Sequence, residues 1–151
     1  ARTAAVAYLE MTEDAVSMTP TEAAAIQKSI ATSEFADEFA ADTEQRMVEL
    51  QATVLGGIVL RIAPVEVRSS ASGDDWLVSV WYAQAITIVG ETVVDDWRTA
   101  DYRLRWVDDA WKIAEFSSDR GPMPGRGSQP PSASAIDFEF QLSGYSDEGL
   151  G

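Results

Sequence analysis

The sequence predicts an α+β domain in which N-terminal helices pack on a curved, four-stranded antiparallel sheet. Apolar residues recur at helical spacing before residue 55 and in strand-like alternation from Ile58 onward. Residues 75–116 form a predicted meander of three long strands that carries all five tryptophans. With 151 residues, of which 46% are apolar, the chain is long enough for one domain with its own core.

Three helices are expected before the strands. Residues 1–16 are rich in alanine and place apolar side chains on one side at helical spacing. The second helix is predicted to begin at Thr19, whose hydroxyl can accept from first-turn amides, with Pro20 at the first helical position. Glu22 completes a capping box, and the helix is expected to run to Ile30.

A cap at Thr32 or Ser33 predicts the start of a third helix, which carries apolar residues at three- and four-residue steps up to Val54. Its other face is acidic, which is typical of a solvated helix surface. Gly56-Gly57 is expected to end the helical half of the chain.

The strands differ in how they are expected to be covered. The first contains Pro64, which lacks an N–H donor and therefore indicates an edge strand or a bulge. The second follows a turn at residues 72–75 and is apolar on both faces, which predicts a central strand covered by helices on one side and by a lid or a partner on the other. One of its faces has Trp76, Val78, Val80 and Tyr82, and the other has Leu77, Trp81 and Ala83.

The third long strand follows a predicted turn at Gly90-Glu91 and alternates apolar with polar side chains, as a half-buried antiparallel strand does. A turn at Asp108-Asp109 then leads into the last strand of the meander. The apolar face of the third strand comprises Ala100, Tyr102, Leu104 and Trp106.

These elements predict a domain over residues 1–120. Residues 121–135 are rich in proline and glycine and are expected to form an extended linker. Residues 136–151 form a tail with a short amphipathic strand that includes Phe138 and Phe140. That strand could fold back on its own sheet or add to the sheet edge of another chain, so both phenylalanines are candidate partner contacts.

Composition excludes several classes of chemistry. A net charge of −14 disfavours direct binding to nucleic acid or anionic lipid. The absence of cysteine and histidine excludes disulfides, thiolate nucleophiles, imidazole bases and the usual zinc sites. The sequence has no calcium-binding loop of the usual pattern and no glycine-rich phosphate loop, so we assign no catalytic residue, metal or cofactor.

The sequence also suggests residues that could line a pocket and one that could contact a partner. Asp96 has the strand parity of Tyr102 and could point into a pocket that also includes Tyr82. Burial there would raise the aspartate pKa and allow a general base beside a tyrosine donor; the alternative is a solvated strand end. Trp97 has the opposite parity, so we expect it to be exposed and available to a partner.

The order of elements resembles the nuclear-transport-factor-two-like, or cystatin-like, superfamily, in which a bent sheet over a helical layer forms a cone with an apolar pocket. That superfamily includes isomerases, dehydratases, binding modules and secretion-apparatus domains, so the fold does not select a function. Its ketosteroid isomerases use an aspartate and a tyrosine in such a pocket.

A finer set of motifs is carried by the run Trp97-Arg98-Thr99, Tyr102, Leu104, Trp106, Asp108-Asp109, Trp111-Lys112, Gly121-Pro122 and Pro124. Over about residues 4–124 the chain resembles actinobacterial proteins of conjugative elements, which look like the VirB-eight-type assembly factor of type IV secretion. In that family a cytoplasmic tail and one transmembrane helix precede an extracytoplasmic cone. The cone builds the channel through protein–protein contacts, without catalysis.

The resemblance therefore implies a non-enzymatic scaffold whose partners are other components of a conjugation or secretion complex, with self-association expected. Membrane attachment would come only through a segment that is not in this chain. The alternatives are a cone-pocket small-molecule binder, or an isomerase- or dehydratase-type enzyme, that uses Tyr82, Asp96 and Tyr102. A third is an accessory module linked to lipid or to the cell wall.

Overall fold

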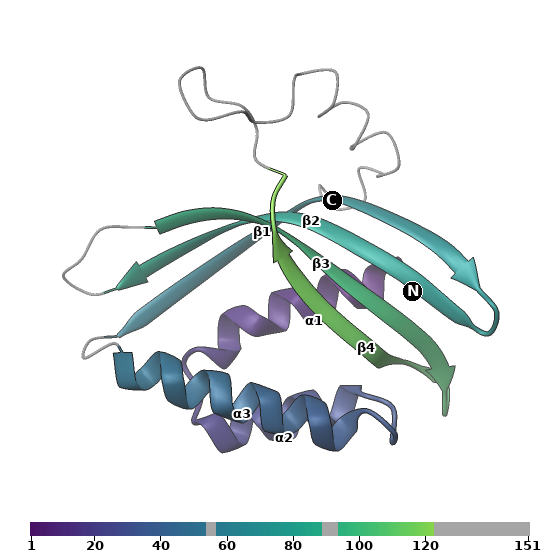
Figure 1. Cartoon of the computed structure of the whole chain (residues 1–151), viewed down its shortest axis with the longest axis horizontal. Helices are drawn as coiled ribbons and strands as arrows, with labels where there is room; N and C mark the ends of the chain where they lie inside the picture. The colour runs from purple at the N-terminus through teal and green to yellow at the C-terminus, as the bar shows by residue number, and fades with distance from the viewer. Residues whose placement is uncertain (54–56, 89–93, 123–151) are drawn as a thin grey trace.

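The computed structural model describes residues 1–53, 57–88 and 94–122 (Figure 1). The predicted α+β class is confirmed: three helices precede four strands, which pair antiparallel in the order β1-β2-β3-β4. None of the described helices is both long and apolar enough to cross a bilayer. The elements are α1 (Arg2–Ala15), α2 (Pro20–Ile30), α3 (Ala36–Thr53), β1 (Ile58–Ser72), β2 (Asp75–Ile88), β3 (Val94–Val107) and β4 (Ala110–Arg120).

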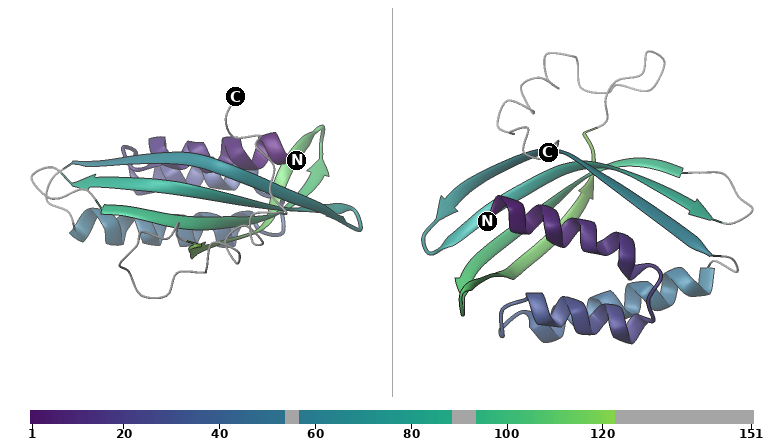
Figure 2. Two further views of the ribbon diagram at one scale, coloured as in Figure 1. Left: turned by 90° about the horizontal axis from the view of Figure 1, so that it is seen from above. Right: turned by 180° about the vertical axis from the view of Figure 1, so that it is seen from behind.

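The sheet is curved, and all three helices lie on its concave side (Figures 1 and 2). Helix α1 packs chiefly on β1, whereas α2 and α3 pair with each other as a second helical layer. The segment after α2 is tied to β4, because the Thr32 N–H donates to the Ile113 carbonyl at 2.8 Å. In addition, the Lys112 ammonium donates to the Ser29 carbonyl at 2.6 Å. The helical pair is therefore held to the sheet at one end.

Helix α2 begins where the sequence predicted, whereas α3 begins later. At α2 the capping box is present: the Glu22 N–H donates to the Thr19 hydroxyl, and the Thr19 N–H donates to the Glu22 carboxylate. Helix α3 begins at Ala36, later than the predicted cap requires. Residues 33–35 form a turn instead, in which the Ala36 N–H donates to the Thr32 carbonyl at 2.9 Å.

The strand predictions from Pro64 and from the turns at residues 72–75 and Asp108-Asp109 are confirmed, whereas the turn predicted at Gly90-Glu91 lies outside the described residues. The register of β1 against β2 shifts between Pro64 and Glu66, and β1 is an edge strand. Asp108 and Asp109 connect β3 to β4 with φ of 50° and 59°, the left-handed pair that a tight hairpin turn requires. Gly73, with φ of 63°, serves the turn between β1 and β2.

The core lies between α1 and the concave face of the sheet. Leu104 and Ile113 are fully buried there and pack with Leu9 of α1. Burying a side chain of this size contributes roughly 1.5–3 kcal/mol each. Where the helices cover the sheet, the apolar residues that the alternation of β2 and β3 assigned to the inner face are thus buried.

Candidate functional site

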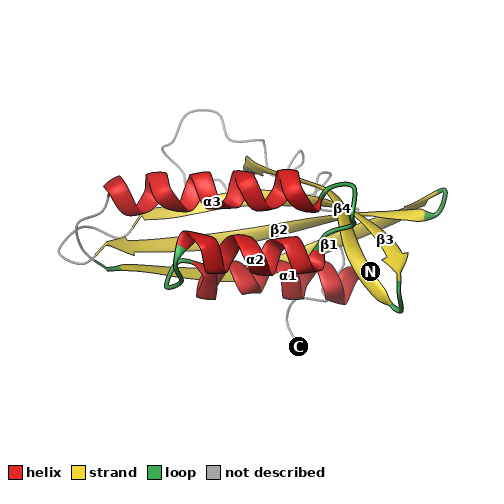
Figure 3. Cartoon of the chain, turned by 90° about the horizontal axis from the view of Figure 1, so that it is seen from below, coloured by secondary structure: helices red, strands yellow, loops and turns green. Residues whose placement is uncertain are grey.

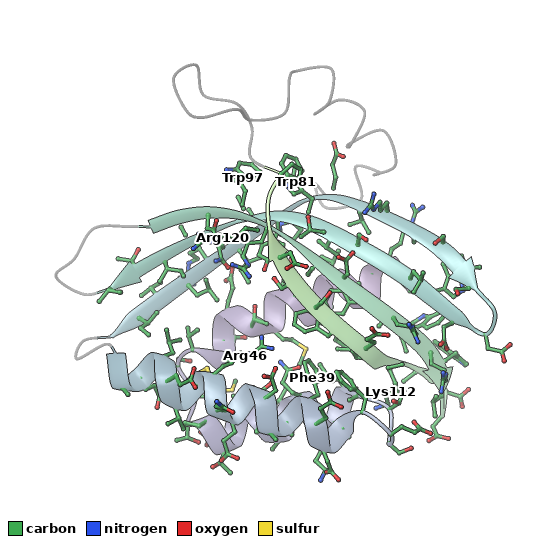
Figure 4. All side chains as sticks on the ribbon, viewed as in Figure 1. Phe39, Arg46, Trp81, Trp97, Lys112 and Arg120 are labelled. Carbon is green, nitrogen blue, oxygen red and sulfur yellow. The ribbon has the colours of Figure 1, made fainter. Side chains whose placement is uncertain are left out.

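A pocket of about 290 Å³ lies between the concave face of the sheet and the helices. All three helices and all four strands contribute to its lining. Figure 4 shows Phe39 and Arg46 rising from α3 toward the sheet, on the side opposite Trp81 and Trp97. The lining residues from the helices and from the C-cap of α1 are Tyr8, Leu9, Thr12, Ala15, Val16, Gln27, Phe39, Thr43, Arg46 and Met47, and those from the strands are Leu60, Ile62, Tyr82, Gln84, Arg98, Tyr102, Ile113, Phe116 and Ser118.

Aromatic rings form the central wall of the pocket. The ring of Phe116 lies 5.1 Å from that of Tyr102 and 5.7 Å from that of Phe39, both in tilted arrangements. Phe39 in turn stacks on Phe35 at 5.1 Å. Such contacts are favourable ring geometries and make this wall rigid as well as apolar.

Tyr102 is the most unusual polar group in the pocket. Its side chain is almost wholly enclosed, with 4% of the residue exposed, yet its hydroxyl makes no hydrogen bond with any described residue. Burial, together with the nearby Tyr82, raises the pKa of Tyr102, so the phenol stays protonated. The Tyr82 hydroxyl, by contrast, pairs with the Ser118 hydroxyl at 3.2 Å.

Arg98 supplies positive charge at one end of the pocket. Its guanidinium donates to the Ser118 hydroxyl at 3.1 Å and to the Ser118 carbonyl at 3.2 Å. It also donates to the Asp96 carboxylate at 3.2 Å. Arg120 approaches the same carboxylate at 3.5 Å, so two guanidinium groups share Asp96.

Of the three pocket residues that the sequence suggested, only two therefore line the pocket. Tyr82 and Tyr102 both line the pocket, whereas Asp96 does not and is held by arginines. A carboxylate paired in this way is poorly placed to accept a proton from a ligand in the pocket. Sequence reasoning missed Arg98, although its strand parity matches that of Tyr102 and would have indicated it.

Among the other polar lining residues that sequence reasoning missed, Gln27 and Arg46 come from helices. Gln27 of α2 is 6% exposed and lines the pocket, and its amide makes no hydrogen bond with a described residue. Arg46 of α3 is largely exposed and pairs with Asp42 one turn earlier. A helical pattern alone does not say which polar side chain will face a sheet.

The convex face carries a tryptophan pair. Trp97 lies there, as its parity predicted, and stacks on Trp81 with ring centroids 4.7 Å apart, which leaves it half-buried. The Trp81 indole N–H donates to the Pro122 carbonyl at 2.9 Å, and Thr99 donates to the Gly121 carbonyl at 2.9 Å. The Gly121-Pro122 segment thus lies against the second face of β2, the one expected to be covered by a lid or a partner. Phe138 and Phe140 lie outside the described residues.

The most exposed tryptophans are ones that the sequence pattern assigned to the inner face. Trp76 is 39% exposed and Trp106 54%. Both lie beside hairpin turns, and Figure 3 shows the hairpin ends projecting beyond the helices, so the helices leave them exposed. We call Trp76 and Trp106 the tip patch. The ring of Trp111 packs edge-on against the ring of Trp106, with the two centroids 5.1 Å apart.

Metal-binding groups do not converge within the residues that the structure describes: no three acidic side chains there are placed to hold an ion together. The site that remains is a pocket whose described lining includes three tyrosines, two glutamines and two arginines among mostly apolar residues.

No protein-family model matches the chain, and no curated protein matches it. Among solved structures, it is similar to the intermembrane-space region of the chloroplast protein ARC6, with 17% sequence identity and a TM-score of 0.41. That likeness covers 74% of this chain and 95% of the other. At this level it carries no argument about activity, and what stands is an α+β fold consistent with the nuclear-transport-factor-two-like cone.

Proposed function

We propose that this domain is a non-enzymatic assembly module of a conjugative transfer apparatus related to type IV secretion, acting through contacts with other proteins. The sequence resemblance over about residues 4–124 motivates the family, and the tip patch is the observation that carries the mode of action. On this proposal the domain is extracytoplasmic, and a segment outside this chain anchors it to the membrane.

The tip patch has the properties of a protein contact surface. Register places Trp76 opposite Leu104, so Trp106, two residues further along β3, is its diagonal neighbour on the same face. Tryptophan is over-represented among the residues that dominate binding energy at interfaces. Two adjacent, exposed indoles at one end of a domain with net charge −14 therefore offer a defined apolar contact.

The geometry at Asp96 favours contact over catalysis. Two arginines share its carboxylate, and the described residues that line the pocket include no aspartate or glutamate. A general base beside the tyrosines would have to come from elsewhere. The partners we propose are other components of the apparatus and further copies of this chain, without direct contact to nucleic acid.

Deleting the gene from a cell that carries the conjugative element, and restoring it in variant forms, tests this proposal. The double variant Trp76→Ser/Trp106→Ser is expected to lower transfer by about tenfold or more, since hot-spot residues dominate interface energy. The matched control, Val48→Ser/Val59→Ser, removes exposed apolar side chains elsewhere and should leave transfer unchanged. Transfer that survives deletion of the gene would show that the conjugative role is wrong.

A further inference from the structure

We infer that the pocket under the sheet binds a small amphipathic anion, namely a carboxylate with an apolar chain or ring. This site is separate from the tip patch, and the inference stands or falls independently of the proposed assembly role. It follows from three properties of the lining: polar side chains without a described hydrogen-bond partner, the sign of the charges, and the order of polar and apolar residues along the strands.

The first property is that two polar side chains of the lining have no hydrogen-bond partner in the part of the chain that the structure describes. Tyr102 and Gln27 are 4% and 6% exposed, line the same pocket and have no side-chain hydrogen bond among the described residues. Neither side chain has a polar atom that is both fully buried and unpaired, so their unpaired polar atoms open onto the pocket, where a ligand can reach them. A ligand with acceptor oxygens would give hydrogen-bond partners to the Tyr102 hydroxyl and to the amide of Gln27.

The second property is charge. The chain has a net charge of −14, yet the charged residues of the lining are Arg46 and Arg98. A guanidinium has five N–H donors, and Arg98 uses three of them on Ser118 and Asp96. Two donors remain, and Arg120 adds a second positive charge beside the same aspartate. This end of the pocket is therefore suited to an anionic oxygen.

The third property is an order along the sheet. Pairing of β3 with β4 places Ala100 opposite Ser118, then Tyr102 opposite Phe116, then Leu104 opposite Ile113. Arg98, one step before Ala100 on the same face, marks the polar end, and Ile113 the apolar end. A ligand whose head lies at Arg98 would lay its apolar body along the wall that the rings of Phe116 and Phe39 form.

The volume sets the size of the ligand. At about 290 Å³ the pocket is at the lower end of the range of about 300–1,000 Å³ that small-molecule sites occupy. A ligand with roughly ten carbon atoms suits such a volume, and decanoate is a suitable probe. Decan-1-ol and decyltrimethylammonium keep its chain length and change only the head group to a neutral or a cationic one.

Isothermal titration calorimetry with these probes, on the full chain, tests the inference. Decanoate is expected to bind at least about tenfold more tightly than decan-1-ol, since a charge-assisted pair contributes more than a neutral contact. Decyltrimethylammonium should not bind. Equal binding of the three probes, or binding of none, would overturn the assignment.

Variants locate the binding. Arg98→Gln should remove the preference for decanoate over decan-1-ol, whereas Arg103→Gln, which removes an exposed ion pair with Glu115, should preserve it. Tyr102→Phe removes an unpaired hydroxyl, so it should weaken decanoate binding several-fold without lowering the melting temperature of the free protein. Decanoate binding that is the same in wild type and in Tyr102→Phe would contradict the proposed site, even if Arg98→Gln failed to fold.

Discussion

The Arg105 guanidinium on β3 donates two hydrogen bonds, of 2.8 and 3.1 Å, to the carboxylate of Asp75, the residue directly opposite it on β2. Asp75 directly precedes Trp76, and Arg105 directly precedes Trp106. The ion pair therefore fixes the two strand ends that present the tip patch. A bidentate arginine–carboxylate pair has a defined geometry, which a simple charge contact would not impose.

Acid should weaken this link. The hydrogen bonds from Arg105 hold the pKa of Asp75 below its ordinary value of 3.8, so the ionised carboxylate is favoured by folding. Its contribution to stability is then complete above the ordinary pKa and is lost as pH falls through the lower pKa of the folded state. Urea unfolding at pH 7 and near pH 3 should show that Asp75→Asn lowers the midpoint at pH 7, with a smaller difference in acid.

Asp108→Asn serves as the control for that experiment, because Asp108 also lies at a hairpin end but has no ion pair among the described contacts. An Asp75→Asn effect that is unchanged across this pH interval would show that the ion pair does not provide the stabilisation.

Removing the carboxylate that two arginines share should destabilise the pocket end. Asp96→Asn leaves Arg98 and Arg120 close together without their common partner. We expect a loss of about 1–3 kcal/mol in the free energy of unfolding, the usual cost of stranding a partly buried charged group. Asp119→Asn, at an exposed position on the neighbouring strand, should change stability by about 0.5 kcal/mol or less. Equal effects of the two would show that Asp96 acts as a solvated strand end.

Two leucines offer a direct comparison of core and surface. Leu104 is fully buried, and Leu77, on the adjacent strand, is 42% exposed. Leu104→Ala should cost about 2–5 kcal/mol through lost burial and the cavity it leaves, whereas Leu77→Ala should cost much less. Denaturant titration of both variants measures the difference, and similar losses would mean that the inner face of the sheet has been misassigned.

Local chemistry in the sequence predicted most of the fold. The capping box at Thr19, the irregularity at Pro64 and the tight turn at Asp108-Asp109 each depend on neighbouring residues alone, and each is present. Strand parity also predicted which side of β2 and β3 a residue occupies. These features are local, so they can be inferred without knowing where the helices dock.

Features that depend on docking could not be inferred in this way. Parity grouped Trp76 and Trp106 with the core, but the helices end before the hairpin tips and leave both exposed. Likewise, parity aligned Asp96 with Tyr102, and only the three-dimensional structure shows that arginines hold its carboxylate outside the pocket lining. Gln27 enters the site from a helix, at a position that no sequence period marked as inward.

Photo-cross-linking at the tip patch tests the central claim most directly. A photoreactive p-benzoylphenylalanine replaces Trp106 in the producing cell, and a parallel strain carries it at Val48, an exposed apolar position on α3. An assembly module predicts that position 106 yields a discrete adduct with another component of the apparatus or with a second copy of the chain, and that position 48 does not. No adduct at position 106 above the level at position 48 would contradict the claim that this domain works by touching other proteins through its tip.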